Sequence, residues 1–214
     1  MMLQTLAKRS YLTLFGLLFL LGLLSPLAHY LAPPPPAEWI AEQKPGIEYL
    51  VSQMPLYAEY ATTTGLHVIP SFFFILLSLV QLSGKIRKRY PAVHRWNGRL
   101  FMLLGVSIGI SGISLALLMP FGGMIESIII TPIGLFFLYA LWRGYAHVRE
   151  RRIGQHRRWM FYMVAVGYAP LTMRMINSIL EASTAIPPRD MFAWNMLIAT
   201  LINLAAVYWW LDRK

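Results

Sequence analysis

The chain has 214 residues, of which 57% are hydrophobic and 13% are charged, and its net charge is +10. This composition excludes a disordered chain and argues against an ordinary soluble domain. The sequence contains no cysteine, which excludes disulfides, thiolate-bound metals and cysteine-bound clusters. Its apolar residues run continuously without alternating, so we predict membrane-spanning helices rather than barrel strands.

Six apolar runs are long enough to cross a bilayer, which needs about 20 residues per helix. In chain order they are Tyr11–Leu31, Gly65–Ser83, Gly98–Met119, Phe121–Trp142, Trp159–Leu180 and Met191–Leu211. We therefore predict an all-α integral membrane bundle of six helices. Residues 1–10 form the N-terminus, residues 32–64 an outer loop, and residues 65–214 a five-helix domain. We expect residues 11–31 to be retained as a span, because the run exceeds the roughly 7–15 residues of a signal-peptide core.

Basic residues fall on one side of the predicted membrane. They form four groups, at Lys8/Arg9, Lys85–Arg99, Arg143–Arg158 and Arg213/Lys214, whereas most acidic residues fall on the other side. This positive-inside pattern places both termini in the cytoplasm. It also explains the net charge through attraction to anionic lipid headgroups, so we expect membrane lipids and no nucleic acid as partners.

Two short stretches resemble one another where a basic loop becomes an apolar run. They read PAVHRWNGRLFMLLG and IGQHRRWMFYMVAVG, and each has a His, a following Arg, a Trp and a Gly eleven residues after the His. The histidines, His94 and His156, begin the third and fifth spans and so lie at similar depth near the cytoplasmic face. Two imidazoles from neighbouring helices can hold a b-type haem inside a bundle.

We therefore predict His94 and His156 as ligands of a haem iron. Guanidinium groups pair well with propionates, and indole rings pack against a porphyrin. The candidate contacts of this kind are Arg95, Arg99, Arg157, Trp96 and Trp159. Two alternatives stay open. His, Arg and Trp also favour the headgroup layer as interfacial anchors, and a zinc or copper site would add His147 to the pair, with Glu150 nearby.

A second set of polar residues is predicted in the outer half of the membrane. Arg174 lies inside the fifth span, where a charge is costly and marks a functional site by default. Asn177 and Glu181 share its helix face, and His67 and Glu126 are placed at similar depth. We treat these five residues as an outer polar pocket for an anion, a quinone or a proton path. The alternative is a structural ion pair between Arg174 and one of the two glutamates.

A resemblance to a known family rests on the run LHVIPSFFFILLSLVQLSGKIRKRYPAVHRWNGRLF, the later HRRWM and the trailing Arg174. In these features the chain resembles a family of predicted bacterial multi-pass membrane proteins of unknown function. The resemblance covers roughly residues 67–177. It implies a bacterial inner membrane as the location, and His67, His94, His156 and Arg174 as the motif positions.

More distantly, the layout is similar to that of the six-helix transmembrane cytochromes b that ascorbate reduces. This similarity implies that histidines on the third and fifth helices hold one haem, here His94 and His156. The second helix supplies His67, but the fourth span has no histidine in its outer half. The similarity therefore implies at most the inner haem.

The sequence leaves three functions open. The first is electron transfer through one b-type haem near the cytoplasmic face, to a quinone or another redox partner near His67 and Arg174. The second is a non-redox membrane protein whose basic inner rim binds lipid headgroups, an anion or a partner complex. The third is a proton-coupled transporter that uses His67, Glu126 and Arg174.

Overall fold

The computed structural model describes residues 24, 31, 55–183 and 186–213. In this part of the chain the protein is helical and contains no strand. The helices are α4 (Ala61–Leu82), α5 (Gly84–Arg89), α6 (Pro91–Leu118), α7 (Met124–Arg149), α8 (Ile153–Gly167), α9 (Ala169–Ser183) and α10 (Pro188–Asp212). The predicted first span and most of the predicted outer loop lie outside the described residues.

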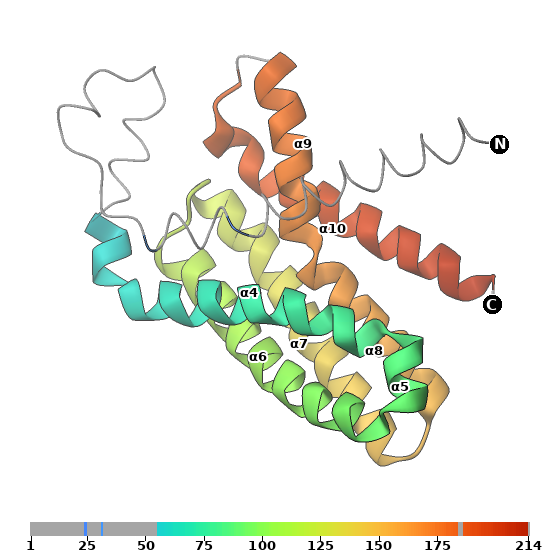
Figure 1. The fold of residues 1–214 in the computed structure, drawn as a ribbon. Coiled ribbons are helices and arrows are strands. Elements are labelled where there is room, and N and C mark those ends of the chain that lie inside the picture. The colour runs from blue at the N-terminus through green and yellow to red at the C-terminus, as the bar shows by residue number, and fades with distance from the viewer. Residues whose placement is uncertain (1–23, 25–30, 32–54, 184–185, 214) are drawn as a thin grey trace, which may run out of the picture.

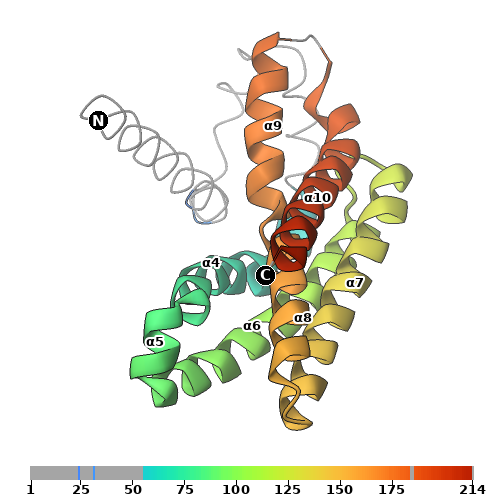
Figure 2. The ribbon, with the colours of Figure 1, turned by 90° about the vertical axis from the view of Figure 1, so that its right-hand side faces the viewer.

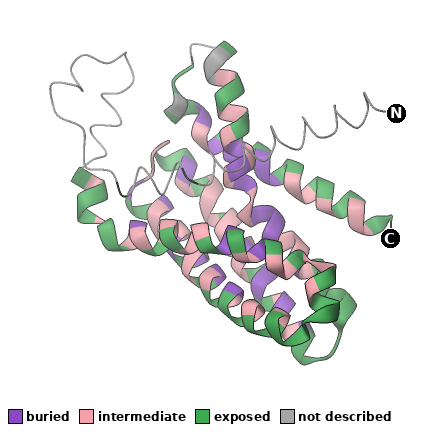
Figure 3. Ribbon diagram, in the orientation of Figure 1, coloured by how far each residue is buried: buried purple, intermediate pink, exposed green. Residues whose placement is uncertain are grey.

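Within the described residues, four helices are long and apolar enough to cross a membrane, namely α4, α6, α7 and the part of α10 from Arg189 onward. Large apolar side chains are exposed on their outward faces, as lipid contact requires, while buried residues gather where the helices face one another (Figure 3). The prediction of an all-helical membrane fold is therefore confirmed. The count of six spans and the cytoplasmic termini stay predictions.

The predicted fifth span, Trp159–Leu180, is not a single helix. It is divided between α8 and α9, which have 15 residues each and meet at Tyr168. Pro170 explains the break, because proline has no N–H to donate to the carbonyl of Val166 and its ring clashes with that carbonyl. The carbonyl instead accepts a hydrogen bond from the Tyr168 N–H. As a result, α9 leaves the direction of α8 (Figure 1).

Polar side chains hold the two sides of this break. Asn203 of α10 donates to the carbonyl of Ala165 in α8 at 3.0 Å and accepts from the Thr172 hydroxyl of α9, also at 3.0 Å. The hydroxyl of Tyr168 lies 2.6 Å from the fully buried hydroxyl of Ser78 in α4. Non-helical backbone at membrane depth is tolerated where protein groups surround it in this way.

Phe74 of α4 lies at the centre of the core. Its ring stacks on Phe101 of α6, with centroids 4.2 Å apart, and lies against Phe137 of α7 at 5.9 Å. A Cβ atom on Gly167 of α8 would come within 2.8 Å of the same ring. One aromatic side chain therefore contacts three other helices, and such close packing needs a glycine on one side.

The helix ends that carry the repeated motifs gather at one end of the bundle. This end holds α5, the start of α6, the end of α7 and the start of α8, at the lower right of Figure 1 and the bottom of Figure 2. It is also the end that the basic residues predict to be cytoplasmic. The fold thus brings two sequence-distant motifs to the same depth.

The break between α8 and α9 generates a first prediction. Replacing Asn203 by Leu should lower the free energy of unfolding by about 1–2 kcal/mol, since a hydrogen bond between membrane helices contributes about 0.6 kcal/mol on average and at most about 1.7. Unfolding in detergent would measure the change. Ser178→Ala is the control, because this exposed hydroxyl bonds within its own helix. Equal losses in both variants would contradict the role of Asn203.

Candidate functional site

A cavity of about 460 Å³ lies among α4, α5, α6, α7 and α8 at the end that carries the motifs. His94 and His156 both line it. Most of its remaining wall is apolar or cationic, including Arg87, Phe101, Arg157, Met160, Phe161 and Val164. The volume is within the range of small-molecule sites, which is about 300–1,000 Å³. The structure therefore unites the two histidines that the repeated motif singled out.

His94 lies in the first turn of α6, which begins with Pro91 at a position where the missing N–H costs nothing. The start of α6 is tied to the end of α4 by Asn97, whose amide donates to the Leu77 carbonyl at 3.1 Å and to Gln81 Oε1 at 2.9 Å. The Nδ1 atom of His94 is buried and has no hydrogen-bond partner among the described residues. Buried polar atoms nearly always have a partner, so the described contacts leave this nitrogen unsatisfied.

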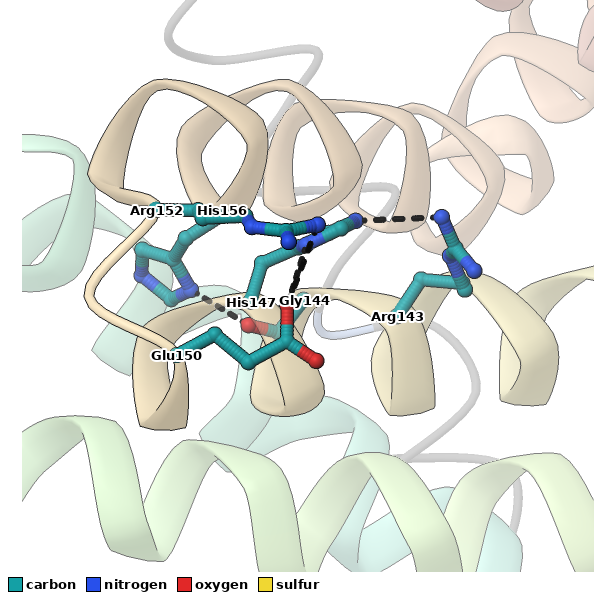
Figure 4. A network of polar contacts seen from close by, with 6 residues as sticks. All are labelled: Arg143, Gly144, His147, Glu150, Arg152 and His156. Carbon is teal, nitrogen blue, oxygen red and sulfur yellow. Dashed lines mark hydrogen bonds and ion pairs between the residues drawn. The ribbon is translucent and has the colours of Figure 1, made fainter.

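His156 lies in the first turns of α8 and has a fixed orientation. Its Nδ1 atom is 2.7 Å from the carbonyl oxygen of Gly144 in α7 (Figure 4). A carbonyl only accepts, so Nδ1 carries the proton and Nε2 keeps a free electron pair. This is the tautomer that metal-ligating histidines use, with the second nitrogen donating to a backbone carbonyl.

Two arginines bring positive charge to the cavity. The guanidinium group of Arg157 lies over the rings of Phe161 and Trp210, at 5.5 Å and 5.3 Å from their centroids, so α8 and α10 together hold it. Arg87 comes from the short basic helix α5. The sequence predicted Arg157 but not Arg87. Arg87 lies in a group of basic residues that indicated only which side of the membrane the loop is on. Apolar walls with two cations suit an amphipathic anion.

The other predicted cofactor contacts do not line the cavity. Trp96 is 69% exposed, and the guanidinium of Arg99 stacks on it at 4.5 Å on the outside of α6. Arg95 is exposed as well. Trp159 packs edge-on against Tyr139 at 5.4 Å. This placement favours interfacial anchoring for Trp96 and Arg99.

His147, the third histidine at this end, belongs to a separate polar network (Figure 4). It is buried at the end of α7, where its Nε2 accepts from Arg143 at 3.1 Å. Its Nδ1 lies 3.6 Å from a carboxylate oxygen of Glu150, and Arg152 lies 3.3 Å from the same oxygen. No cluster of three metal-ligating side chains occurs in the described part of the chain. A zinc or copper site of three histidines therefore has no geometric support.

Two of the predicted outer residues are held by contacts near their own helix ends. The Nδ1 atom of His67 lies 3.2 Å from the Ser111 hydroxyl and 3.3 Å from the Ile108 carbonyl of α6. Glu126, 6% exposed in the first turn of α7, accepts from the N–H of Gly122 at 2.5 Å. These contacts join α4 to α6 and cap the start of α7.

The remaining outer residues lie on α9. The guanidinium of Arg174 donates to the Pro170 carbonyl at 3.2 Å, and Asn177 accepts from Asn195 of α10 at 2.7 Å. Among the side chains that the structure describes, no ion pair joins Arg174 to Glu126. The side chain of Glu181 lies outside the described part. The outer pocket therefore remains a prediction, and its four described members are held by separate partners.

Comparison with known proteins places the chain more firmly in the membrane. The sequence model of a family described as "Predicted membrane protein (DUF2306)" matches residues 64–211, a range that includes both cavity histidines. No curated protein and no solved structure matches the chain significantly. The likeness to ascorbate-reducible cytochromes b therefore stays a prediction.

A second prediction concerns the side from which the cavity opens. The sequence has no cysteine, so a single introduced thiol is the only one that a maleimide can label. Position 154 lines the cavity and has open space around it, so Gly154→Cys should react with an impermeant maleimide from the cytoplasmic side. Met124→Cys, 78% exposed at the opposite end of α7, should react from the other side. Mass shifts in inverted and right-side-out vesicles would show this, and labelling of both from one side would contradict it.

Proposed function

We propose that the chain, which belongs to the DUF2306 family of predicted membrane proteins, is a b-type cytochrome of the bacterial inner membrane that transfers electrons through one haem. One observation carries the proposal. His94 and His156 come from different helices and line the same cavity. Paired imidazoles on facing helices are the usual way in which a helical bundle holds a haem.

The residues at the cavity fit the chemistry of a haem. His94 and His156 would hold the iron, since both line the cavity and the bond of His156 Nδ1 to Gly144 leaves its Nε2 as an electron-pair donor. Arg87 and Arg157 would pair with the two propionates. An iron held by two imidazoles carries one electron at a time.

The chain's own residues orient and shield this site. Phe101, fully buried, forms part of the apolar wall and also stacks on Phe74 in the core. The site is therefore built on the hydrophobic core of the bundle, which favours a fixed ligand geometry. The proposal includes a quinone or another redox partner as acceptor, in the outer half near His67 and Arg174.

The test is a visible spectrum of the protein purified in detergent from a haem-replete host. Reduced-minus-oxidised spectra should show sharp α and Soret bands at about one haem per chain, as a bis-imidazole site requires. His94→Ala and His156→Ala should each abolish the bands. Trp96→Ala is the control, because Trp96 is 69% exposed two residues after His94 and does not line the cavity. A flat spectrum from a folded, monodisperse sample would overturn the proposal.

Anionic lipid binding is a second candidate function, supported by one set of contacts. Arginines stack on aromatic rings at the inner helix ends: Arg89 on Tyr90 at 5.5 Å, Arg99 on Trp96 at 4.5 Å and Arg213 on Trp209 at 3.8 Å. Such pairs place cations and amphipathic rings at the headgroup layer. This function predicts a flat spectrum and tightly bound anionic phospholipid, whose retention falls when these arginines become Gln. The proton-coupled transporter gains no comparable support.

A further inference from the structure

We infer that Gly144 of α7 is the positioning residue of the His156 site. Its carbonyl selects the nitrogen of His156 that faces the cavity, and its missing side chain sets the distance between α7 and α8. The inference rests on the proposed haem function and names the residue that tunes ligand strength at that site. Three features of the structure support it.

The first feature is the hydrogen bond itself. The 2.7 Å separation between His156 Nδ1 and the Gly144 carbonyl is at the short end for such bonds. A backbone acceptor of this kind fixes the plane of a ligating imidazole and raises its basicity. The acceptor is a main-chain atom, so it cannot be predicted from a side-chain motif in the sequence.

The second feature is a close approach that only glycine permits. A Cβ atom at position 144 would lie 2.6 Å from Sδ and 3.3 Å from Cγ of Met160. Met160 is one helical turn after His156, so both side chains leave the same face of α8. Met160 therefore rests on the Cα atom of Gly144 while His156 bonds to its carbonyl. A larger residue at position 144 would push both side chains away together.

The third feature is that the segment around Gly144 is fixed on both sides (Figure 4). Arg143 bonds to His147 one turn later, and its guanidinium lies 5.5 Å over the ring of Trp159 in α8. The N–H of Arg152 donates to the His147 carbonyl at 2.9 Å and closes the α7–α8 turn. These contacts hold α7 in place, so the Gly144 carbonyl does not follow a displaced His156.

The same helix offers a matched control. A Cβ atom on Gly134 would lie 2.6 Å from Cγ1 of Ile113, which is as close as the approach at Gly144. Neither Gly134 nor Ile113 lines the cavity. Gly134→Ala therefore introduces a steric clash of similar size and the same change in helix propensity, but it leaves His156 undisturbed.

The test is a haem titration of detergent-purified apoprotein, followed at the Soret band. Gly144→Ala should bind haem about 10–100-fold more weakly than the wild type, the usual cost of losing such an outer contact, and the remaining bound haem should have a shifted midpoint potential. Gly134→Ala should bind with wild-type affinity and potential although it unfolds more easily. The double variant Gly144→Ala/Met160→Ala removes the atoms that the new Cβ would meet. It should therefore recover the affinity of Met160→Ala, which is the reference because Met160 also lines the cavity.

The outcomes separate the two proposals. If the wild type binds no haem, the proposed function and this inference both fall. If the wild type binds haem and Gly144→Ala behaves like Gly134→Ala, only this inference falls. If Gly144→Ala binds weakly and the double variant does not recover, the close approach of Met160 is not the cause, and that also overturns the inference.

Discussion

Glycines packed against bulky side chains hold this bundle together. In lipid an apolar surface gains little by meeting another helix, so association depends on close van der Waals contact at small residues. Three helix pairs have such contacts: α6 and α7 through Gly105 with Leu141, Gly109 with Leu138 and Gly134 with Ile113, α7 and α8 through Gly144 with Met160, and α4 and α8 through Gly167 with Phe74. The positions of the histidines follow from these contacts, because they set the separations between the helices that carry them.

The division of the fifth span follows from a second constraint, that backbone groups inside a membrane need partners within the protein. A proline in mid-span removes one donor, and the chain responds with two short helices instead of one kinked helix. α8 then keeps its place against α7 and the cavity, while α9 packs on α10. Asn203 stabilises this arrangement, because it bonds to both α8 and α9.

The sequence predicts much of this, and its failures have physical reasons. Continuous apolar runs located α4, α6, α7 and α10, because hydrophobic length is a local property. Pro170 predicts a local kink in the fifth span, but not its division into two helices, since the stabilising partner Asn203 is distant in sequence. Matched depth was enough to pair His94 with His156. Arg87 and the Gly144 carbonyl were not predictable, because the first is one of many basic loop residues and the second is a backbone atom.

The contacts of α10 with α8 have a consequence for the order of biosynthesis. A chain emerges from the ribosome N-terminus first, so Gln81, His94 and His156 are in the membrane before Trp210 and Asn203 are made. Arg157 gains its second stacking partner, and α8 its link to α9, only when the last helix inserts. Until then the nascent bundle lacks the α10 contacts at Arg157 and at the break between α8 and α9. The stacking contact that holds Arg157 at the cavity wall is therefore completed only when Trp210 reaches the membrane.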